Sequence, residues 1–202
     1  ANRSRPPPRD RVDLGRRDFT VNAMAIEVTG DTPTLVDPHG GAADLMTKQL
    51  RTPLGPEISF SDDPLRMLRA ARFIAGYDLQ PSDDLIAAVT AMAPRLEIVS
   101  AERLRDEFDK LITVDHPSAG LFFLHDTGLS DQFLPELSAM RLEHDPIHRH
   151  KDVFAHTIAV VENVRPVREH PDGRAPFDFR RVRLAALFHD VGKPRTRGFQ
   201  PG

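Results

Sequence analysis

An aspartate and an arginine three positions apart, Asp63 and Arg66, have the chemistry to recognise one edge of a nucleotide base. An ionised carboxylate only accepts hydrogen bonds, and a guanidinium only donates them. Cytosine and adenine both present an amino donor beside a ring-nitrogen acceptor. The pair would therefore favour these two bases over uracil and guanine. The alternative is a helix N-cap followed by a solvated arginine, because both are common on protein surfaces.

Further arginines follow at helical spacing. In a helix that begins near Pro64, Arg66, Arg69 and Arg72 would lie along one side, and the opposite side would be apolar. A guanidinium fork can donate two parallel hydrogen bonds to a phosphate. The spacing thus predicts a ribbon of arginines suited to a triphosphate.

A second charged cluster, Arg16-Arg17-Asp18, precedes a strand-like segment that starts at Phe19. The two arginines could hold a triphosphate or a ribose, and Asp18 could accept a hydrogen bond from a sugar hydroxyl. A surface patch of ion pairs would explain the same residues. The cluster is therefore a second candidate for nucleotide binding.

Histidines and an aspartate gather in the C-terminal part of the chain. His156, His189 and Asp190 are ligand types that suit transition metals, as are His148 and His150. His156 and the His189-Asp190 dipeptide each fall on or at the end of an apolar helix. Two such helices bury their apolar faces by packing together, so we expect the three residues to converge. The chain has no cysteine, which excludes thiolate ligands.

The pattern of residues along the chain predicts a mainly α-helical framework with a small N-terminal β-hairpin, which would position these side chains. Alternating residues and a turn at residues 29–31 predict two short strands between residues 19 and 36. Capping residues, which are Asp63, Ser82 and Ser100, and apolar residues at helical spacing predict where the helices lie. Helices are expected at about residues 63–76, 82–93, 100–112, 117–128, 151–165 and 179–190.

The composition limits the class of protein. The 202 residues carry 27 Lys and Arg against 30 Asp and Glu, a formal net charge of −3. Any contact with RNA would depend on local basic patches, because the global charge is slightly negative. No apolar run reaches the ~20 residues that span a membrane, and no secretory signal opens the chain. We therefore expect a cytoplasmic protein without membrane contact.

Four motifs carry a family resemblance by their order and spacing: RRDFTVNAMA, DPHGGAADL, DDPLRMLRAARF and ERLRDEFDKL. Across roughly residues 14–137 they resemble the bacterial (class II) CCA-adding tRNA nucleotidyltransferases and their poly(A) polymerase relatives. The resemblance implies the C-terminal part of a nucleotidyltransferase α/β head over residues 15–59. It also implies a helical nucleotide-selecting and RNA-binding neck over residues 60–140.

The resemblance further implies roles for individual residues. Six residues would bind the nucleotide: Arg17, Asp18, Asp63, Arg66, Arg69 and Arg72. In the family, the first two handle the sugar and phosphates, and the Asp-x-x-Arg pair selects the base. Three residues of the last motif would instead buttress the neck helices: Glu102, Arg103 and Glu107.

The C-terminal segment carries a second resemblance. DVFAHTIAVVENV and RLAALFHDVGKP resemble the start of an HD-type phosphohydrolase domain, expected as an incomplete domain over residues 145–202. The resemblance implies a divalent transition metal at His156, His189 and Asp190. A later aspartate that completes the site in the family has no counterpart in these residues. We therefore expect an open, weak metal site.

The family's upstream Gly-Ser-x-x-x-Asp-x-Asp element also has no counterpart in this sequence. Its aspartates would hold the two Mg²⁺ ions that activate the primer hydroxyl and stabilise the leaving pyrophosphate. Residues 1–12 are rich in Arg and Pro, and residues 1–14 are expected to form a disordered or atypical leader. We therefore interpret the chain as a fragment that carries no catalytic residue and is inactive alone.

The resulting hypothesis is a CCA-adding enzyme whose complete form transfers CMP and AMP from CTP and ATP to tRNA 3′ ends with Mg²⁺. The expected partners are tRNA, CTP and ATP, and the oligomeric state is left open. Poly(A) polymerase is the near alternative, because it shares every motif above. An HD-type metal-dependent phosphohydrolase and a catalytically inactive RNA-binding module are alternatives from other classes. Because the Asp-x-x-Arg pair serves either base, the sequence leaves open whether C, A or both are added.

Overall fold

The structure is a computed structural model that describes residues 8–29, 32–140, 153–166 and 177–196. Helices form most of it, and the strands are short. In chain order the elements are α1 (Pro8–Gly15), η1 (Thr20–Asn22), β1 (Ala25–Glu27), β2 (Thr34–Val36), α2 (Gly41–Met46), β3 (Gln49–Leu50), α3 (Pro56–Asp62), α4 (Leu65–Tyr77), β4 (Gln80–Pro81), α5 (Asp83–Met92), η2 (Ala93–Ile98), α6 (Ala101–Ile112), α7 (Ser118–Asp126), η3 (Ser130–Gln132), α8 (Pro135–Ala139), α9 (Val153–Asn163), α10 (Phe179–Phe188) and α11 (Lys193–Thr196).

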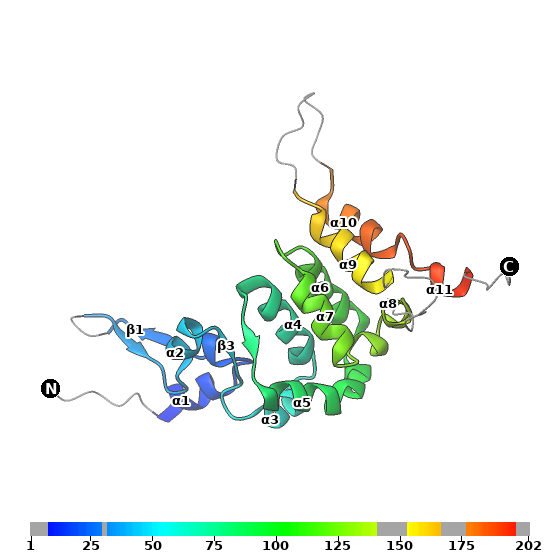
Figure 1. The fold of residues 1–202 in the computed structure, drawn as a ribbon. Coiled ribbons are helices and arrows are strands. Elements are labelled where there is room, and N and C mark those ends of the chain that lie inside the picture. Colours follow the sequence, from blue (N-terminus) through cyan, green and yellow to red (C-terminus); the bar gives the residue numbers. More distant parts are fainter. Residues whose placement is uncertain (1–7, 30–31, 141–152, 167–176, 197–202) are drawn as a thin grey trace.

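The predicted fold class, mainly α with a small N-terminal β-hairpin, is confirmed. Figure 1 shows the β1–β2 hairpin at one end of the molecule, the helices α4, α6 and α7 in the middle, and α9 and α10 beyond them. A second, two-stranded sheet pairs β3 with β4 in parallel beside α4. The sequence pattern did not predict this pair, because two residues per strand are too few to show alternation.

The hairpin is shorter than predicted. Strands β1 and β2 pair antiparallel, but the predicted strand from Phe19 onward begins only at Ala25. Residues 20–22 instead turn as a 3-10 helix. Phe19 is fully buried, and the centre of its ring lies 5.0 Å from that of Phe73 in α4. Because the Phe19 ring packs against α4, the residues just after it stay at the helical core, and the hairpin begins only at Ala25.

The expectation of a disordered leader over residues 1–14 is wrong for residues 8–14, which belong to α1. Near the end of this helix, Leu14 is only 5 % exposed. Burial of an apolar side chain stabilises a short helix that would be marginal in isolation. Residues 1–7 lie outside the described part of the chain.

Helix α4 has the buried face that its sequence predicts, and it packs against α6 and α7. Its fully buried side chains are Met67, Leu68, Ala70 and Ala71. The carboxylate Oδ1 of Asp63 accepts a hydrogen bond from the backbone N–H of Leu65 at 3.2 Å, but the helix begins one residue later than predicted, at Leu65, with Pro64 in the N-cap position. The helix runs one residue past its predicted end at Gly76, to Tyr77. It ends where Asp78 adopts a left-handed φ of 55°, a conformation that aspartate tolerates.

Helices α4 and α7 approach each other closely at Gly120. A Cβ atom there would lie 2.4 Å from the carbonyl oxygen of Ala71 and 2.6 Å from the side chain of Leu111. Such contacts are far shorter than van der Waals distances, so this crossing requires glycine. Helix α6 completes the three-helix core, and the hydroxyl of Ser100 caps it as predicted by accepting from the backbone N–H of Arg103.

Helices α9 and α10 pack on each other, at the positions predicted for the last two helices. A fully buried arginine of α10, Arg183, joins them to the three-helix core. Its guanidinium donates to the carbonyl oxygens of Ile112 at 2.8 Å, Asp115 at 2.9 Å and Val164 at 3.2 Å. Burial is the main cause that lowers the pKa of Arg183.

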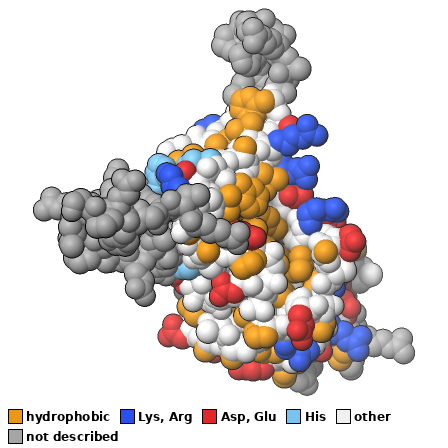
Figure 2. Space-filling model, turned by 90° about the vertical axis from the view of Figure 1, so that its right-hand side faces the viewer, with side chains coloured by type: hydrophobic (Ala, Val, Ile, Leu, Met, Phe, Trp, Pro, Cys, Tyr) orange, Lys and Arg blue, Asp and Glu red, His pale blue; other side chains and the backbone are white. Residues whose placement is uncertain are grey.

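The surface carries charges of both signs. Figure 2 shows basic and acidic side chains interspersed with apolar ones on the face turned toward the viewer. Within the described ranges, no helix has the length and apolar character that a membrane span needs.

Candidate nucleotide-binding site

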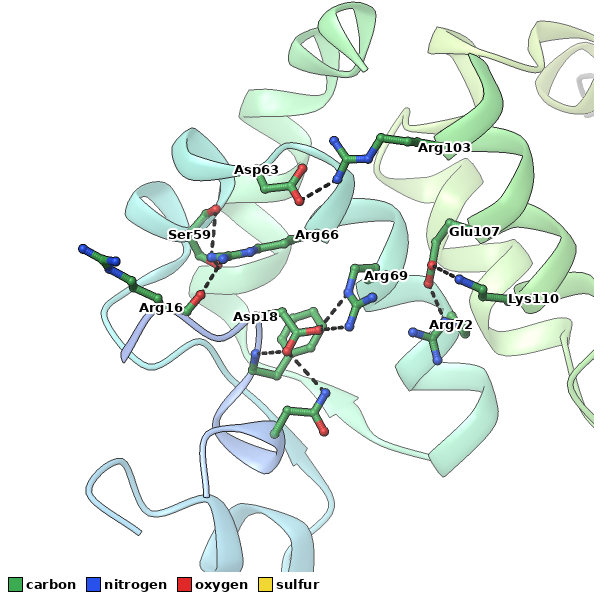
Figure 3. Close-up of polar contacts among 12 residues, drawn as sticks. Arg16, Asp18, Ser59, Asp63, Arg66, Arg69, Arg72, Arg103, Glu107 and Lys110 are labelled. Carbon is green, nitrogen blue, oxygen red and sulfur yellow. Dashed lines mark hydrogen bonds and ion pairs between the residues drawn. The ribbon is translucent and has the colours of Figure 1, made fainter. Parts of the chain in front are cut away.

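A pocket of about 390 Å³ lies where the loop after α1 meets the starts of α4 and α6 (Figure 3). Its lining residues are Arg16, Arg17, Asp18, Asn22, Asp63, Leu65, Arg66, Arg69 and Arg103. Five of these nine are arginines. Such a lining is suited to an anionic ligand, because each guanidinium can donate charge-assisted hydrogen bonds.

Asp63 occupies the break between α3 and α4, with both carboxylate oxygens engaged but not saturated. Oδ1 accepts from the N–H of Leu65, and Oδ2 accepts from Nη2 of Arg103 at 2.8 Å. A carboxylate has about four lone-pair sites, so Asp63 can still accept a hydrogen bond from a ligand. The surrounding bonds hold the carboxylate in one orientation at the pocket wall.

Arg66 points back from the first turn of α4 and links three segments (Figure 3). Its Nη1 donates to the hydroxyl of Ser59 at 3.0 Å, and its Nη2 donates to the carbonyl oxygen of Arg16 at 2.5 Å. Its Nε donates a hydrogen bond to no group among the described residues. Asp63 and Arg66 therefore line the same pocket, each fixed by neighbours and each with hydrogen-bonding capacity to spare.

Asp18 is 7 % exposed and holds Arg69 in place. Its Oδ2 accepts from Nε and Nη2 of Arg69 at 2.8 Å and 2.5 Å, and its Oδ1 accepts from the N–H of Phe19 and from Asn22. By contrast, Arg17 lies at the rim in an exposed ion pair with Asp13 at 3.5 Å. Exposed pairs of this kind are weak, so Arg17 can turn toward a ligand.

Arg72 does not line the pocket. Its Nε donates to Oε1 of Glu107, and Glu107 is only 2 % exposed. Lys110 approaches the other oxygen of Glu107 at 3.5 Å. The structure thus brings five of the six expected nucleotide-binding residues to one pocket and places the sixth in a buried ion pair between α4 and α6.

Three lining residues, Asn22, Leu65 and Arg103, were given no nucleotide-binding role from the sequence. Arg103 was expected to buttress the neck helices, yet it reaches the pocket and contacts Asp63. No local pattern could predict this, because 40 positions separate the two residues. Asn22 donates to the carboxylate of Asp18 at 3.3 Å, but a strand was expected here, in which residues four positions apart are not neighbours.

The predicted convergence of His156, His189 and Asp190 is present. One ligand atom from each lies within 4.8 Å of the others. Nδ1 of His189 donates to the carbonyl oxygen of Ala186 at 2.7 Å, because a carbonyl only accepts, and Nε2 is the ring atom that faces Asp190. This Nε2 is 3.2 Å from Asp190. His148 and His150 lie outside the described residues.

A lysine competes for the carboxylate of this cluster. Nζ of Lys193 lies 2.6 Å from Oδ2 of Asp190, and this hydrogen bond is the main cause that lowers the pKa of Asp190. Figure 2 shows histidine side chains at the surface beside a basic and an acidic side chain. Two imidazoles and a carboxylate are suitable metal ligands, but a cation bound here must compete with Lys193.

Fold and site together define a mainly helical protein with an arginine-rich pocket, suited to an anionic ligand, between a hairpin-bearing N-terminal part and a helical core. Three family models match successive parts of the chain: the poly A polymerase head domain over residues 6–51, the probable RNA and SrmB-binding site of polymerase A over residues 78–140, and the HD domain over residues 153–201. These matches make the chain similar, part by part, to CCA-adding enzymes and poly(A) polymerases.

Individual relatives agree with this assignment. The chain is 38 % identical over 201 residues to the A-adding tRNA nucleotidyltransferase of Deinococcus radiodurans, covering 96 % of this chain and 43 % of the relative. It is 36 % identical over 189 residues to the multifunctional CCA protein of Azoarcus sp., covering 91 % and 42 %. The crystal structure of the Bacillus stearothermophilus CCA-adding enzyme in complex with CTP is similar with a TM-score of 0.65 at 30 % identity, covering 89 % and 39 %. The chain thus spans about two fifths of the length of these relatives.

Proposed function

We propose that this chain is the nucleotide-selecting part of a tRNA nucleotidyltransferase that adds CMP and AMP, from CTP and ATP, to tRNA 3′ ends. The observation that carries the proposal is the shared pocket of Asp63 and Arg66, which also contains Arg17, Asp18 and Arg69. The names of the relatives favour tRNA over poly(A) as the acceptor. A cytoplasmic location belongs to the same proposal, because it rests on tRNA as the partner.

Some residues of the pocket would bind the base, and others would bind the phosphates. Asp63 would accept a hydrogen bond from the amino group of cytosine or adenine, and Arg66 would donate to the adjacent ring nitrogen. Uracil and guanine present a carbonyl oxygen where the amino group would be, so it would face the carboxylate with no hydrogen between them. Arg17 and Arg69 would offset the negative charge of the triphosphate.

CCA-adding enzymes generally use divalent metals. The carboxylates of this pocket do not fit a site for two Mg²⁺ ions. Asp18 is buried under Arg69, Asp63 is held by Arg103, and the 202 residues contain no Asp-x-Asp sequence. The residues of this pocket therefore bind and orient the nucleotide, and we assign no metal-dependent step to them.

Asp63→Ala is expected to lower the affinity for CTP and ATP about tenfold, within the ~1–3 kcal/mol that a base-edge contact supplies. The affinity for UTP and GTP should stay the same or rise, because alanine also removes the repulsion of their carbonyl oxygens. Competition titrations against a fluorescent nucleotide measure all four affinities. Asp62→Ala is the matched control, since Asp62 is exposed beside Asp63 and does not line the pocket. If Asp63→Ala left the ratio of CTP to UTP affinity unchanged, Asp63 would be a helix cap and nothing more.

We further propose a weak divalent transition-metal site at His156, His189 and Asp190, supported by the convergence of their ligand atoms. Such a site keeps open positions for water and binds less tightly than a closed one. Asp190→Asn should abolish Mn²⁺ binding in a calorimetric titration. Lys193→Ala should strengthen it, because the ammonium group that occupies the carboxylate is removed. Mn²⁺ binding that neither substitution changes would contradict the site. Phosphatase activity is expected to be weak or nil.

A further inference from the structure

Ser59, in α3, contacts both residues that we propose to recognise the base. Its carbonyl oxygen accepts from the backbone N–H of Asp63 at 3.2 Å and from Nη1 of Arg66 at 3.4 Å. Its hydroxyl accepts from the same Nη1 at 3.0 Å. Asp63 lies in the break between α3 and α4, and Arg66 lies in the first turn of α4. One residue thus spans the break and touches each member of the pair, and Figure 3 shows its contact with Arg66.

The position of this serine is fixed. Ser59 is 4 % exposed, so its hydroxyl has few alternatives to the guanidinium of Arg66. The second anchor of Arg66 is the carbonyl oxygen of Arg16, which is backbone and cannot be changed by a side-chain substitution. Arginine has a long side chain with many rotamers, and two anchors restrict it to one arrangement at the pocket wall. A guanidinium that is held before the nucleotide arrives loses less freedom when it binds.

We propose that Ser59 is a positioning residue for base selection, which acts by fixing the guanidinium of Arg66; this rests on the proposed role of Asp63 and Arg66. Ser59 does not line the pocket, so its hydroxyl contributes through Arg66 rather than through the nucleotide. A loosened Arg66 can still meet a ring nitrogen, but it can also swing to meet the carbonyl oxygen of uracil or guanine. Loss of the hydroxyl should therefore reduce discrimination more than overall affinity.

The test measures a discrimination ratio, the dissociation constant for UTP divided by that for CTP, together with the same ratio for GTP over ATP. Ser59→Ala should lower both ratios about threefold to tenfold, the usual net effect of losing one intramolecular hydrogen bond. Ser59→Thr keeps a hydroxyl and should retain most of the discrimination. Ser61→Ala is the matched control, because Ser61 lies exposed on the same helix, and it should leave both ratios unchanged.

A double-mutant cycle with Arg66→Ala separates positioning from a purely structural role. If Ser59 acts through Arg66, Ser59→Ala should change the ratios no further in the Arg66→Ala background. Thermal unfolding of each variant gives the independent measure of stability. A lower melting temperature with unchanged ratios would make Ser59 structural and overturn the inference. An equal fall in the ratios on Ser59→Ala, with and without Arg66, would also overturn the inference.

These outcomes differ from a failure of the proposed function. If Arg66→Ala abolished discrimination and Ser59→Ala did not affect it, the inference would fail while the base-selecting role of Arg66 stood. If the unaltered chain bound all four nucleotides equally, the proposed function would fail, and the inference with it.

Discussion

Arg72→Ala is expected to lower the free energy of unfolding by about 3–5 kcal/mol, the usual cost of removing one partner of a buried ion pair. The structure gives the reason. Arg72 donates to Glu107, which is 2 % exposed and packed between α4 and α6. Without the arginine, that carboxylate stays buried with Lys110 at 3.5 Å as a more distant partner. Urea unfolding followed by circular dichroism measures the change.

The control for this prediction removes both charges. Arg72→Leu combined with Glu107→Leu should cost less stability than Arg72→Ala alone, because no unpaired charge is left behind. If Arg72 bound phosphates, as the sequence predicted, the result would be different. In that case Arg72→Ala would keep the stability of the unaltered chain and weaken the binding of all four nucleotides alike.

A polypeptide of these 202 residues is expected to incorporate no CMP or AMP into a tRNA that lacks its 3′ end, even with Mg²⁺ present. The pocket orients the nucleotide, but no carboxylate pair in it is free to hold the two metal ions that neutralise charge during phosphoryl transfer. Positioning without that neutralisation leaves the barrier high. Incorporation of radiolabelled CTP or ATP, resolved by gel electrophoresis, gives the measurement. CTP binding by the same preparation shows that the polypeptide is folded.

Robust Mg²⁺-dependent incorporation by this polypeptide would mean that other carboxylates hold the metal. Asp18, Asp37 and Asp44 are the residues to substitute in that case. Each has a structural partner here. Asp37 accepts from the N–H groups at the start of α2, Asp44 accepts from Thr20 and Arg51, and Asp18 holds Arg69. Metal binding at any of them would therefore compete with these bonds.

Local patterns in the sequence were sufficient for most helices. The apolar spacing in α4 predicts which side is buried, and Ser100 and Asp63 predict where two helices begin. These signals succeed because they act over a few neighbouring residues. The leader and the first strand were predicted less well. There a tertiary contact, the burial of Leu14 or Phe19, outweighs local composition.

In the candidate site, too, local patterns predicted some residues, and the roles of others depend on tertiary contacts. The Asp-x-x-Arg spacing and the Arg-Arg-Asp cluster pointed to the pocket because their residue types limit the chemistry that they can do. The roles of Arg72 and Arg103 could not be predicted, since they depend on partners 35 and 40 positions away. Arg69 and Arg72 share one row of the helix. Only the packing of α6 decides that the first faces the pocket and the second faces Glu107.

If the Asp63 and Arg66 pair selects cytosine and adenine, the unaltered chain should bind the four nucleotides with different affinities. Calorimetric titration with CTP, ATP, UTP and GTP at one ionic strength is the most direct measurement, because all four share the triphosphate that the arginines bind. We expect CTP and ATP to bind about tenfold more tightly than UTP and GTP, in line with the ~1–3 kcal/mol of a base-edge contact. Equal affinities for the four nucleotides would contradict the claim and leave the pocket as a phosphate-binding site without base selection.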